Sequence, residues 1–269
     1  MCQDAVVEIK IDPDRLLWWL IPGLVTVELA IVMMDALISE LGWVSVGAVQ
    51  RFFNITREDG LANFFSSFQM LGVGVVLVLI TLVVRSQTRG STSKLFWGWG
   101  LIAALFIYIG IDDATALHER IGTLFSELVT APDGGANPGF MGQLYDKFPS
   151  YSWQLVLGPF VAAAGIFVIA FLTRQLPTLR LKVLMLVAFG LFAMAIGMDF
   201  IEGIDEGFEN DVMVRVADYF STFPSRAVHF SKSIEEFLEM AGTTIFLFVF
   251  LKTLMSATPS IKFEFGQQQ

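Results

Sequence analysis

Six long apolar stretches restrict the possible folds of this 269-residue chain more than any other feature of its sequence. Each is close to the roughly 20 residues that an α-helix needs to cross the hydrocarbon layer of a membrane. The stretches cover residues 16–38, 68–84, 95–113, 153–173, 182–201 and 236–256. The whole chain is 55% hydrophobic, which exceeds the usual apolar content of soluble domains. The sequence therefore predicts an all-α integral membrane protein with six transmembrane helices in a single polytopic domain, residues 1–269.

Charge and cysteine content exclude several classes of function. The formal net charge is −9, so a nucleic acid is not an expected partner. The single cysteine, Cys2, excludes an internal disulfide and a metal site built from cysteines. The sequence has neither a phosphate-binding glycine loop nor the His-Glu-x-x-His motif of zinc proteases. The expected partner is the lipid bilayer, and the sequence leaves open a homo-oligomer or a larger membrane complex.

Basic residues indicate on which side of the membrane each connection lies. The short connections 85–94 and 173–182 each carry three basic residues. Cytoplasmic loops are enriched in Lys and Arg, so we predict that these connections and both chain termini are cytoplasmic. The longer connections 39–67, 120–152 and 207–233 would then lie outside the cytoplasm. The predicted location is the inner (plasma) membrane of the cell.

An internal repeat relates two of the helix ends. The segment IYIGIDDATALHERIG (107–122) aligns with MAIGMDFIEGIDEGFE (194–209), so that Asp112 matches Asp199. The helix after each long connection also begins in a similar way, with a polar residue followed closely by a glycine. These polar residues are Gln69, Gln154 and Glu239. Parallel repeats of this kind occur in membrane proteins, and the two similarities together predict three tandem helical hairpins.

Acidic side chains gather at the predicted outer ends of the helices. An ionised carboxylate near the bilayer centre costs roughly 2.5–3.5 kcal/mol on insertion scales, so such residues normally face the interior of a helix bundle. In one continuous helix, Asp112 and Glu119 would share a face. The predicted site consists of Asp112, His118, Glu119, Asp199, Glu202, Glu206, Glu235, Glu236 and Glu239. Glu28 and Asp35 lie in the first helix and are predicted to form an intramembrane relay.

This group of acids has few basic neighbours and needs a positive partner. Either several carboxyl groups are protonated or a cation is bound. Carboxylates with at most two imidazoles suit a divalent ion, Mg²⁺, Ca²⁺, Mn²⁺, Fe²⁺ or, less well, Zn²⁺. A ferritin-like di-iron site is not expected, because neither His118 nor His229 has a Glu three residues before it.

Three functions are compatible with such a site. The first is cation binding or transport, in which the acids capture the ion at the outer face. The second is a metal-dependent membrane enzyme acting on a lipid or isoprenoid head group, with metal-activated water and with His118 or a carboxylate as general base. The third is a scaffold subunit of a membrane complex. A plainer interpretation of Glu235 and Glu236 is that they favour the N-terminus of the last helix through its dipole.

One segment also resembles a known sequence pattern. IDDATALHERIG (111–122) is similar to a helix end in uncharacterised bacterial polytopic membrane proteins, where an acid pair precedes Leu-His-Glu. The resemblance covers this segment and the general pattern of six spans. It implies a bacterial inner membrane and no particular activity.

Overall fold

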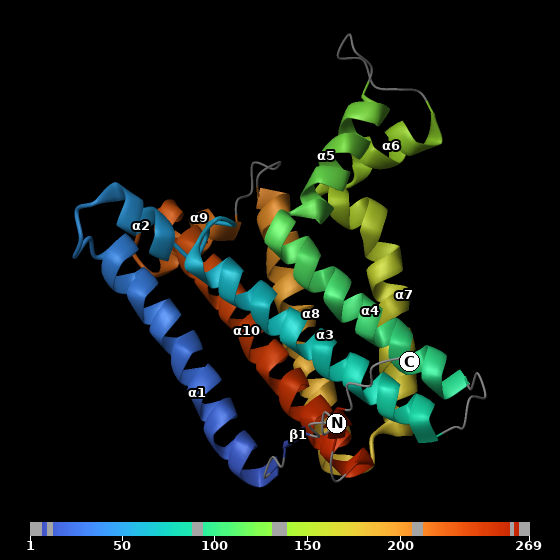
Figure 1. Ribbon diagram of the computed structural model, residues 1–269. Coiled ribbons are helices and arrows are strands. Elements are labelled where there is room, and N and C mark those ends of the chain that lie inside the picture. Colours follow the sequence, from blue (N-terminus) through green and yellow to red (C-terminus); the bar gives the residue numbers. More distant parts are fainter. Residues whose placement is uncertain are drawn as a thin grey trace, which may run out of the picture.

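Long membrane-crossing helices dominate the computed structural model, which describes residues 7–9, 13–87, 94–130, 139–205, 212–258 and 261–263. Six of the described helices are long and apolar enough to cross a membrane (Figure 1). They are α1 (Pro13–Met34), continued by the π-helix η1 (Asp35–Glu40), α3 (Leu61–Gln87), α4 (Lys94–Thr115), α7 (Ser152–Gln175), α8 (Leu179–Asp205) and α10 (Pro224–Ala257). Each contains one of the six predicted stretches. The prediction of an all-α multi-pass membrane protein is confirmed.

The two ends of the helix bundle differ. One end carries the short helices α2 (Gly47–Phe53), α5 (Leu117–Val129), α6 (Phe140–Lys147) and α9 (Val212–Tyr219) (Figure 1). At the opposite end, strand β1 (Val7–Ile9) pairs antiparallel with strand β2 (Ile261–Phe263). The first and the last segments that the structure describes therefore lie at the same end of the bundle. We call the first end the acidic end, because the predicted site residues of α4, α8 and α10 lie toward it, and the second the terminal end.

An apolar core occupies the terminal half of the bundle. The central helix is α10, which packs against α1, α3 and α8, while α3 packs closely along α4. Aromatic rings of α10 and α4 meet edge to face: the Phe250 centroid lies 5.6 Å from that of Phe106 and 6.4 Å from that of Trp99. The buried apolar residues of this core come mainly from the half of each long helix nearer the terminal end. Polarity therefore changes along the bundle axis.

Side-by-side packing does not simply follow the three predicted hairpins. Within the third hairpin, α8 packs extensively against α10. Other close contacts join different hairpins, because α3 lies along α4 and α10 lies along both α3 and α1. This arrangement places α10 in the middle, where side chains from α1, α3, α4 and α8 can reach it.

Two glycines let α3 and α4 approach each other closely. A methyl group on Gly74 would lie 2.6 Å from Ile107 Cγ1, and one on Gly110 would lie 3.1 Å from the backbone nitrogen of Leu71. Small residues at such contacts are typical of helix pairs in membranes. Gly197 matches Gly110 in the internal repeat, yet it has open space where a methyl group would lie. The sequence repeat is therefore not a repeat of packing at these positions.

The expectation of one continuous helix through residues 112–119 is wrong. Ala116 has a φ of 49°, in the left-handed region that a right-handed helix cannot continue through. For this reason α4 ends just before it and α5 begins just after it. Asp112 and Glu119 consequently belong to two different helices and do not share one helical face.

The dipole interpretation of Glu235 and Glu236 is also wrong. Helix α10 begins at Pro224, a residue whose missing N–H is tolerated in the first turn of a helix. Glu235 and Glu236 lie about three turns inside α10, beyond the reach of the unpaired N–H groups at its start. Their position at the centre of the bundle therefore needs another explanation.

Candidate functional site

Acidic residues of α10 meet acids from two neighbouring helices. Glu235, Glu236 and Glu239, which we call the α10 acids, lie in the acidic half of this helix. The carboxylates of Glu236, Glu235, Asp113 on α4 and Asp199 on α8 are close enough to Glu239 to repel its charge. Several neighbouring carboxylates repel one another unless some of them are protonated or a cation is bound between them. The arrangement therefore creates a demand for positive charge inside the bundle.

Lys232 supplies part of this positive charge. Its Nζ lies 3.3 Å from Glu202 Oε1 on α8, and the charges of Glu235 and Asp199 also act on it. The Tyr151 hydroxyl donates to the same Glu202 oxygen at 3.3 Å. Glu202 Oε2 and Glu235 Oε2 are buried and have no hydrogen-bond partner among the residues that the structure describes. These two oxygens can accept a further donor or a cation.

Two aspartates are held by uncharged side chains. Gln154 Nε2 donates to Asp199 Oδ2 at 2.8 Å, and Ser67 Oγ donates to Asp113 Oδ2 at 2.8 Å. Asn63 Nδ2 also donates to the backbone carbonyl of Asp113 at 3.2 Å. Gln154 Oε1 is buried without a hydrogen-bond partner. Neutral donors of this kind orient a carboxylate without cancelling its charge.

Asp112 is engaged with the first turn of α5. Its Oδ1 accepts the backbone N–H of His118 at 2.8 Å, and its Oδ2 lies 3.0 Å from His118 Nδ1. The His118 ring packs edge-on against Trp153, with 5.0 Å between centroids. Burial disfavours the charged ring, but the hydrogen bond to Asp112 and the surrounding negative charges outweigh it and raise the pKa of His118. Asp112 thus fixes the ring through Nδ1 and leaves Nε2 on its far side.

Glu119 on α5 forms a carboxyl pair with Glu58 in the loop before α3. Partial burial and a hydrogen bond with Glu58 raise the pKa of Glu119 to about 7. A hydrogen bond between two carboxyl groups requires a proton on one of them. Glu58 was not predicted from the sequence, because no local pattern in residues 54–59 indicates that this loop reaches α5.

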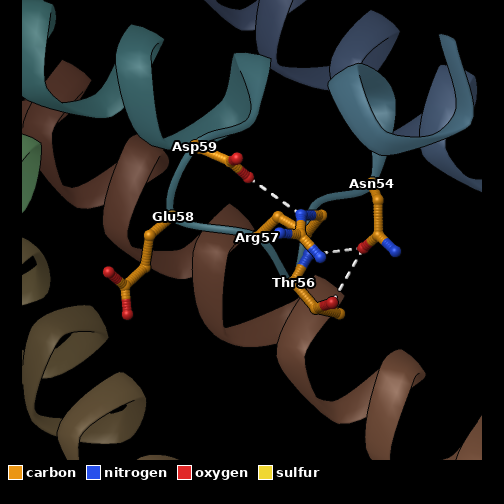
Figure 2. A pocket seen from close by; sticks show the side chains of 5 residues that line it. All are labelled: Asn54, Thr56, Arg57, Glu58 and Asp59. Atoms are coloured by element: carbon orange, nitrogen blue, oxygen red, sulfur yellow. Dashed lines mark hydrogen bonds and ion pairs between the residues drawn. The ribbon is translucent and has the colours of Figure 1, made fainter. Parts of the chain in front are cut away.

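The same loop surrounds a shallow hollow of about 420 Å³, lined by Asn54, Thr56, Arg57, Glu58 and Asp59 (Figure 2). Asn54 Oδ1 accepts the backbone N–H of Thr56 at 3.0 Å and its hydroxyl at 2.7 Å. Arg57 Nε donates to Asp59 Oδ1 at 2.8 Å. Figure 2 shows Glu58 pointing away from these bonded groups. The hollow is therefore shaped by internal hydrogen bonds of the loop, and Glu58 is the lining residue directed elsewhere.

Asp35 joins α1 to α10 at the start of the π-helix. Its buried carboxylate accepts from the backbone N–H of Ile55 at 3.0 Å, from His229 Nε2 at 2.8 Å and from Ser233 Oγ at 3.2 Å. His229 Nδ1 lies 3.5 Å from Glu40 Oε1 at the other end of η1. Both oxygens of Asp35 and both ring nitrogens of His229 are thus engaged, which suits a structural joint better than a relay.

Glu28 is completely buried near the middle of α1. Its Oε1 accepts from Gln69 Nε2 on α3 at 2.8 Å and from Thr244 Oγ1 on α10 at 2.5 Å. Gln69 Nε2 also donates to Thr244 Oγ1 at 2.9 Å, so the three side chains form a triangle that links three helices. Within the described part of the chain, Glu28 Oε2 and Gln69 Oε1 are buried with no hydrogen-bond partner. An unsatisfied buried polar group costs about 1–3 kcal/mol, so a further hydrogen-bond donor at these two oxygens would stabilise the triangle.

The predicted site residues contact other polar side chains in groups of two or three. Among the residues that the structure describes, no three His, Cys, Asp or Glu side chains are grouped so that they could hold a metal ion. Asp112 bonds to His118, Asp199 to Gln154 and Glu202 to Lys232. Glu206 lies outside the described residues. A divalent metal therefore stays a prediction for this end of the bundle.

Comparison with known proteins identifies the family of the chain. The sequence profile of a family described as "Domain of unknown function (DUF8692)" matches residues 17–254. The chain belongs to this family. The match begins in α1 and ends in α10, so the DUF8692 domain contains the helix bundle and the polar groups described above. No solved structure matches the chain.

One known protein is similar to part of the chain. A stretch of 112 residues is 33% identical to "Probable aquaglyceroporin-2" of Gibberella zeae. The stretch covers 41% of this DUF8692 chain and 29% of that protein. The chain therefore spans less than a third of the length of this relative.

Proposed function

We propose that this protein binds cations at its acidic end and passes them, protons included, to Glu28 inside the membrane. The observation that carries the proposal is the position of Glu28, an ionisable side chain with no exposed surface in a candidate membrane span. Ionisable residues are rare at such depth, and those present usually mark ion or proton pathways. In this proposal the acidic end faces the outside of the cell, because the basic connections 85–94 and 173–182 favour the cytoplasmic side.

The α10 acids supply the route between the acidic end and Glu28. Glu235, Glu236 and Glu239 follow one another at spacings that keep them on one side of the helix. Thr244, which donates to Glu28, comes five residues after Glu239, a distance of about 7.5 Å along the helix axis. An ion held among the α10 acids therefore lies about one and a half turns from the triangle.

The apolar core limits how far an ion can travel in this conformation. Beyond Glu28 the bundle is filled by side chains such as Leu77, Phe106 and Phe250. A charged ion is strongly disfavoured in such surroundings. The geometry therefore supports uptake and binding from the acidic end, and transport across the whole membrane requires a second conformation in which this core opens.

Lys232 affects which cation the acidic end can hold. Its ammonium group, 3.3 Å from Glu202, already occupies part of the negative field. A divalent ion, Mg²⁺, Ca²⁺, Mn²⁺, Fe²⁺ or Zn²⁺, would use the free oxygens Glu202 Oε2 and Glu235 Oε2 and would repel Lys232. A proton or a monovalent cation meets less repulsion. The proposal includes a divalent ion as a ligand of the acidic end. Metal analysis of the purified protein by mass spectrometry tests whether such an ion is bound.

The partial relative is consistent with a transport function. Its printed name, "Probable aquaglyceroporin-2", refers to that protein and to a chain more than three times as long as the shared stretch. The similarity therefore supports a membrane transport class for this chain, and the cation preference rests on the acids alone.

A second candidate is a membrane enzyme, and one observation favours it. Asp112 holds His118 through Nδ1, an arrangement that prepares Nε2 to accept a proton from a reacting group. A substrate at the acidic end would be a lipid or isoprenoid head group. Turnover of such a lipid that is lost in both Asp112→Asn and His118→Gln would establish this activity. Ion flux without lipid turnover would favour the first proposal.

The deciding experiment is reconstitution of the full chain into liposomes. We expect proton or cation uptake under an imposed gradient, with loss of uptake in Glu28→Gln and Glu239→Gln. Glu127→Gln is the matched control, because Glu127 is exposed on α5 and the same change should leave uptake intact. Absence of both flux and bound cation in the wild-type protein, at every pH tested, would contradict the proposal.

A further inference from the structure

Two acid–amide pairs in the bundle share one unusual feature. In the first, Gln69 Nε2 donates to Glu28 Oε1 at 2.8 Å, and in the second, Gln154 Nε2 donates to Asp199 Oδ2 at 2.8 Å. In both pairs the amide oxygen Oε1 is buried with no hydrogen-bond partner. At Glu28 the second carboxyl oxygen, Oε2, is also buried and unpartnered. The Glu28 pair therefore has two free hydrogen-bond acceptors, and none of the described residues donates a hydrogen bond to them.

The number of free oxygens indicates what could complete this pair. A Ca²⁺ ion takes six to eight oxygen ligands and Mg²⁺ demands an octahedral set, whereas Glu28 and Gln69 together offer two free oxygens. The oxygen of Thr244 already donates to Glu28 and accepts from Gln69. One hydrogen atom, in contrast, satisfies two acceptors at once when it is bonded covalently to one and donated to the other.

We infer that the Glu28–Gln69–Thr244 triangle is a proton-binding site, in which Glu28 carries a proton on Oε2 and donates it to Gln69 Oε1. An O–H bond forms at Oε2, the donor that delivers the proton is left with one positive charge less, and Glu28 becomes neutral. The acid and the amide then form the two-bond ring that such groups make with each other. This inference rests on the proposed function and deepens it, because it names the ion that Glu28 receives.

The groups that face Glu28 are suited to a neutral acid. From α3 the facing group is Gln69 and from α10 it is Thr244, and both are uncharged. On α1 itself the next acid is Asp35, which is bonded to Ile55, His229 and Ser233. The nearest acid before Thr244 on α10 is Glu239. None of these places a positive charge against Glu28, so a proton is the simplest source of neutrality.

Asp199 provides a natural contrast. Its amide partner is held in the same way, but the positive charges of Lys232 and His118 act on this part of the bundle. A cation near a carboxylate favours its ionised form. We therefore expect the two similar acid–amide pairs to differ in protonation, with Glu28 neutral and Asp199 charged.

Infrared difference spectroscopy of the full chain in lipid nanodiscs tests this inference directly. A protonated carboxylic acid has a carbonyl stretching band well separated from that of a carboxylate. The spectrum of wild-type protein minus that of Glu28→Gln should contain this band, and the band should shift in D₂O. The difference spectrum for Asp199→Asn, the matched control, should contain carboxylate bands in its place.

The possible outcomes separate this inference from the proposed function. A carboxylate band assigned to Glu28 at neutral pH would overturn the proton site, and a metal ion lost from Glu28→Gln in elemental analysis would do the same. Neither measurement depends on flux. If the acid band is present while the liposomes show no uptake and the acidic end binds no cation, the proton site stands and the proposed function fails.

Discussion

The Asp112 carboxylate holds His118 twice, through the backbone N–H at 2.8 Å and through ring Nδ1 at 3.0 Å. The left-handed backbone of Ala116 makes this possible, because it turns the chain so that α5 begins beside the end of α4. Two bonds from one carboxylate fix both the position and the orientation of the imidazole. Asp112 lies in the last turn of the membrane span that ends at Thr115, and His118 lies just beyond that span.

Replacement of Asp112 by Asn should lower the pKa of His118. The raised pKa means that the bond stabilises the fold fully below the ordinary value of 6.5, and that this stability is lost as pH rises through the raised value. NMR titration can follow this, since the chain has only two histidines. An unchanged His118 titration in Asp112→Asn would show that the carboxylate does not control the ring, and the resonance of His229 serves as the internal control.

The Glu58–Glu119 pair should make stability fall as pH rises. The folded chain retains the Glu119 proton up to a pKa of about 7, whereas the unfolded chain releases it near 4.5. Stability contributed by this group is therefore present below pH 4.5, decreases between these two values and is lost above pH 7. Thermal unfolding in detergent from pH 4 to 8 measures the effect. Glu58→Gln and Glu119→Gln should each flatten this part of the profile, and a wild-type profile without such a slope would contradict the pairing.

Removal of the Asp35 carboxylate should weaken the joint between α1 and α10. Asp35→Ala leaves the backbone N–H of Ile55 and the ring of His229 without their buried acceptor. Loss of one partner from a buried charged pair typically costs about 3–5 kcal/mol. Asp35→Asn keeps one acceptor and should cost less. Denaturant unfolding measures both, with Asp59→Ala in the exposed loop as a control, and equal stability of Asp35→Ala and wild type would rule out the joint.

A larger residue at Gly74 should force α3 and α4 apart. The added carbon would lie 2.6 Å from Ile107 Cγ1, and overpacking of this kind typically costs about 1–3 kcal/mol. Gly190→Val is the matched control, because no atom lies within 4 Å of its added carbon. We expect a lower unfolding temperature for Gly74→Val than for Gly190→Val. The reverse order would show that the close contact is not a determinant of stability.

The six spans could be predicted from sequence because the membrane imposes a length and a polarity on every crossing helix. The boundaries of the helices were harder to predict where polar residues extend a helix beyond the hydrocarbon layer. The first three turns of α10 contain Arg226, His229 and Lys232. Because these residues are polar, the apolar stretch of the sequence begins only at residue 236, although the helix begins at Pro224. The break at Ala116 was also hidden, because an alanine carries no local sign of a left-handed conformation.

The polar contacts could be predicted only in part. Burial of Glu28 follows from the cost of exposing an acid to lipid, and the sequence did single out Glu28. Its partners Gln69 and Thr244 are 41 and 216 residues away, and they meet it because of the order of helices in the bundle. No pattern within one helix encodes that order. Glu58 was missed for a similar reason, since its role depends on where a loop lies over another helix.

The pairing of β1 with β2 has a consequence for the first helix. Val7 lies opposite Phe263 in this pair, so a segment before the first long helix and a segment after the last one lie side by side. Asp35 fixes the end of α1 to α10 and to the loop at Ile55, while β1, which precedes α1 in the sequence, pairs with β2. The helix that carries Glu28 is thus fastened like an interior segment of the chain.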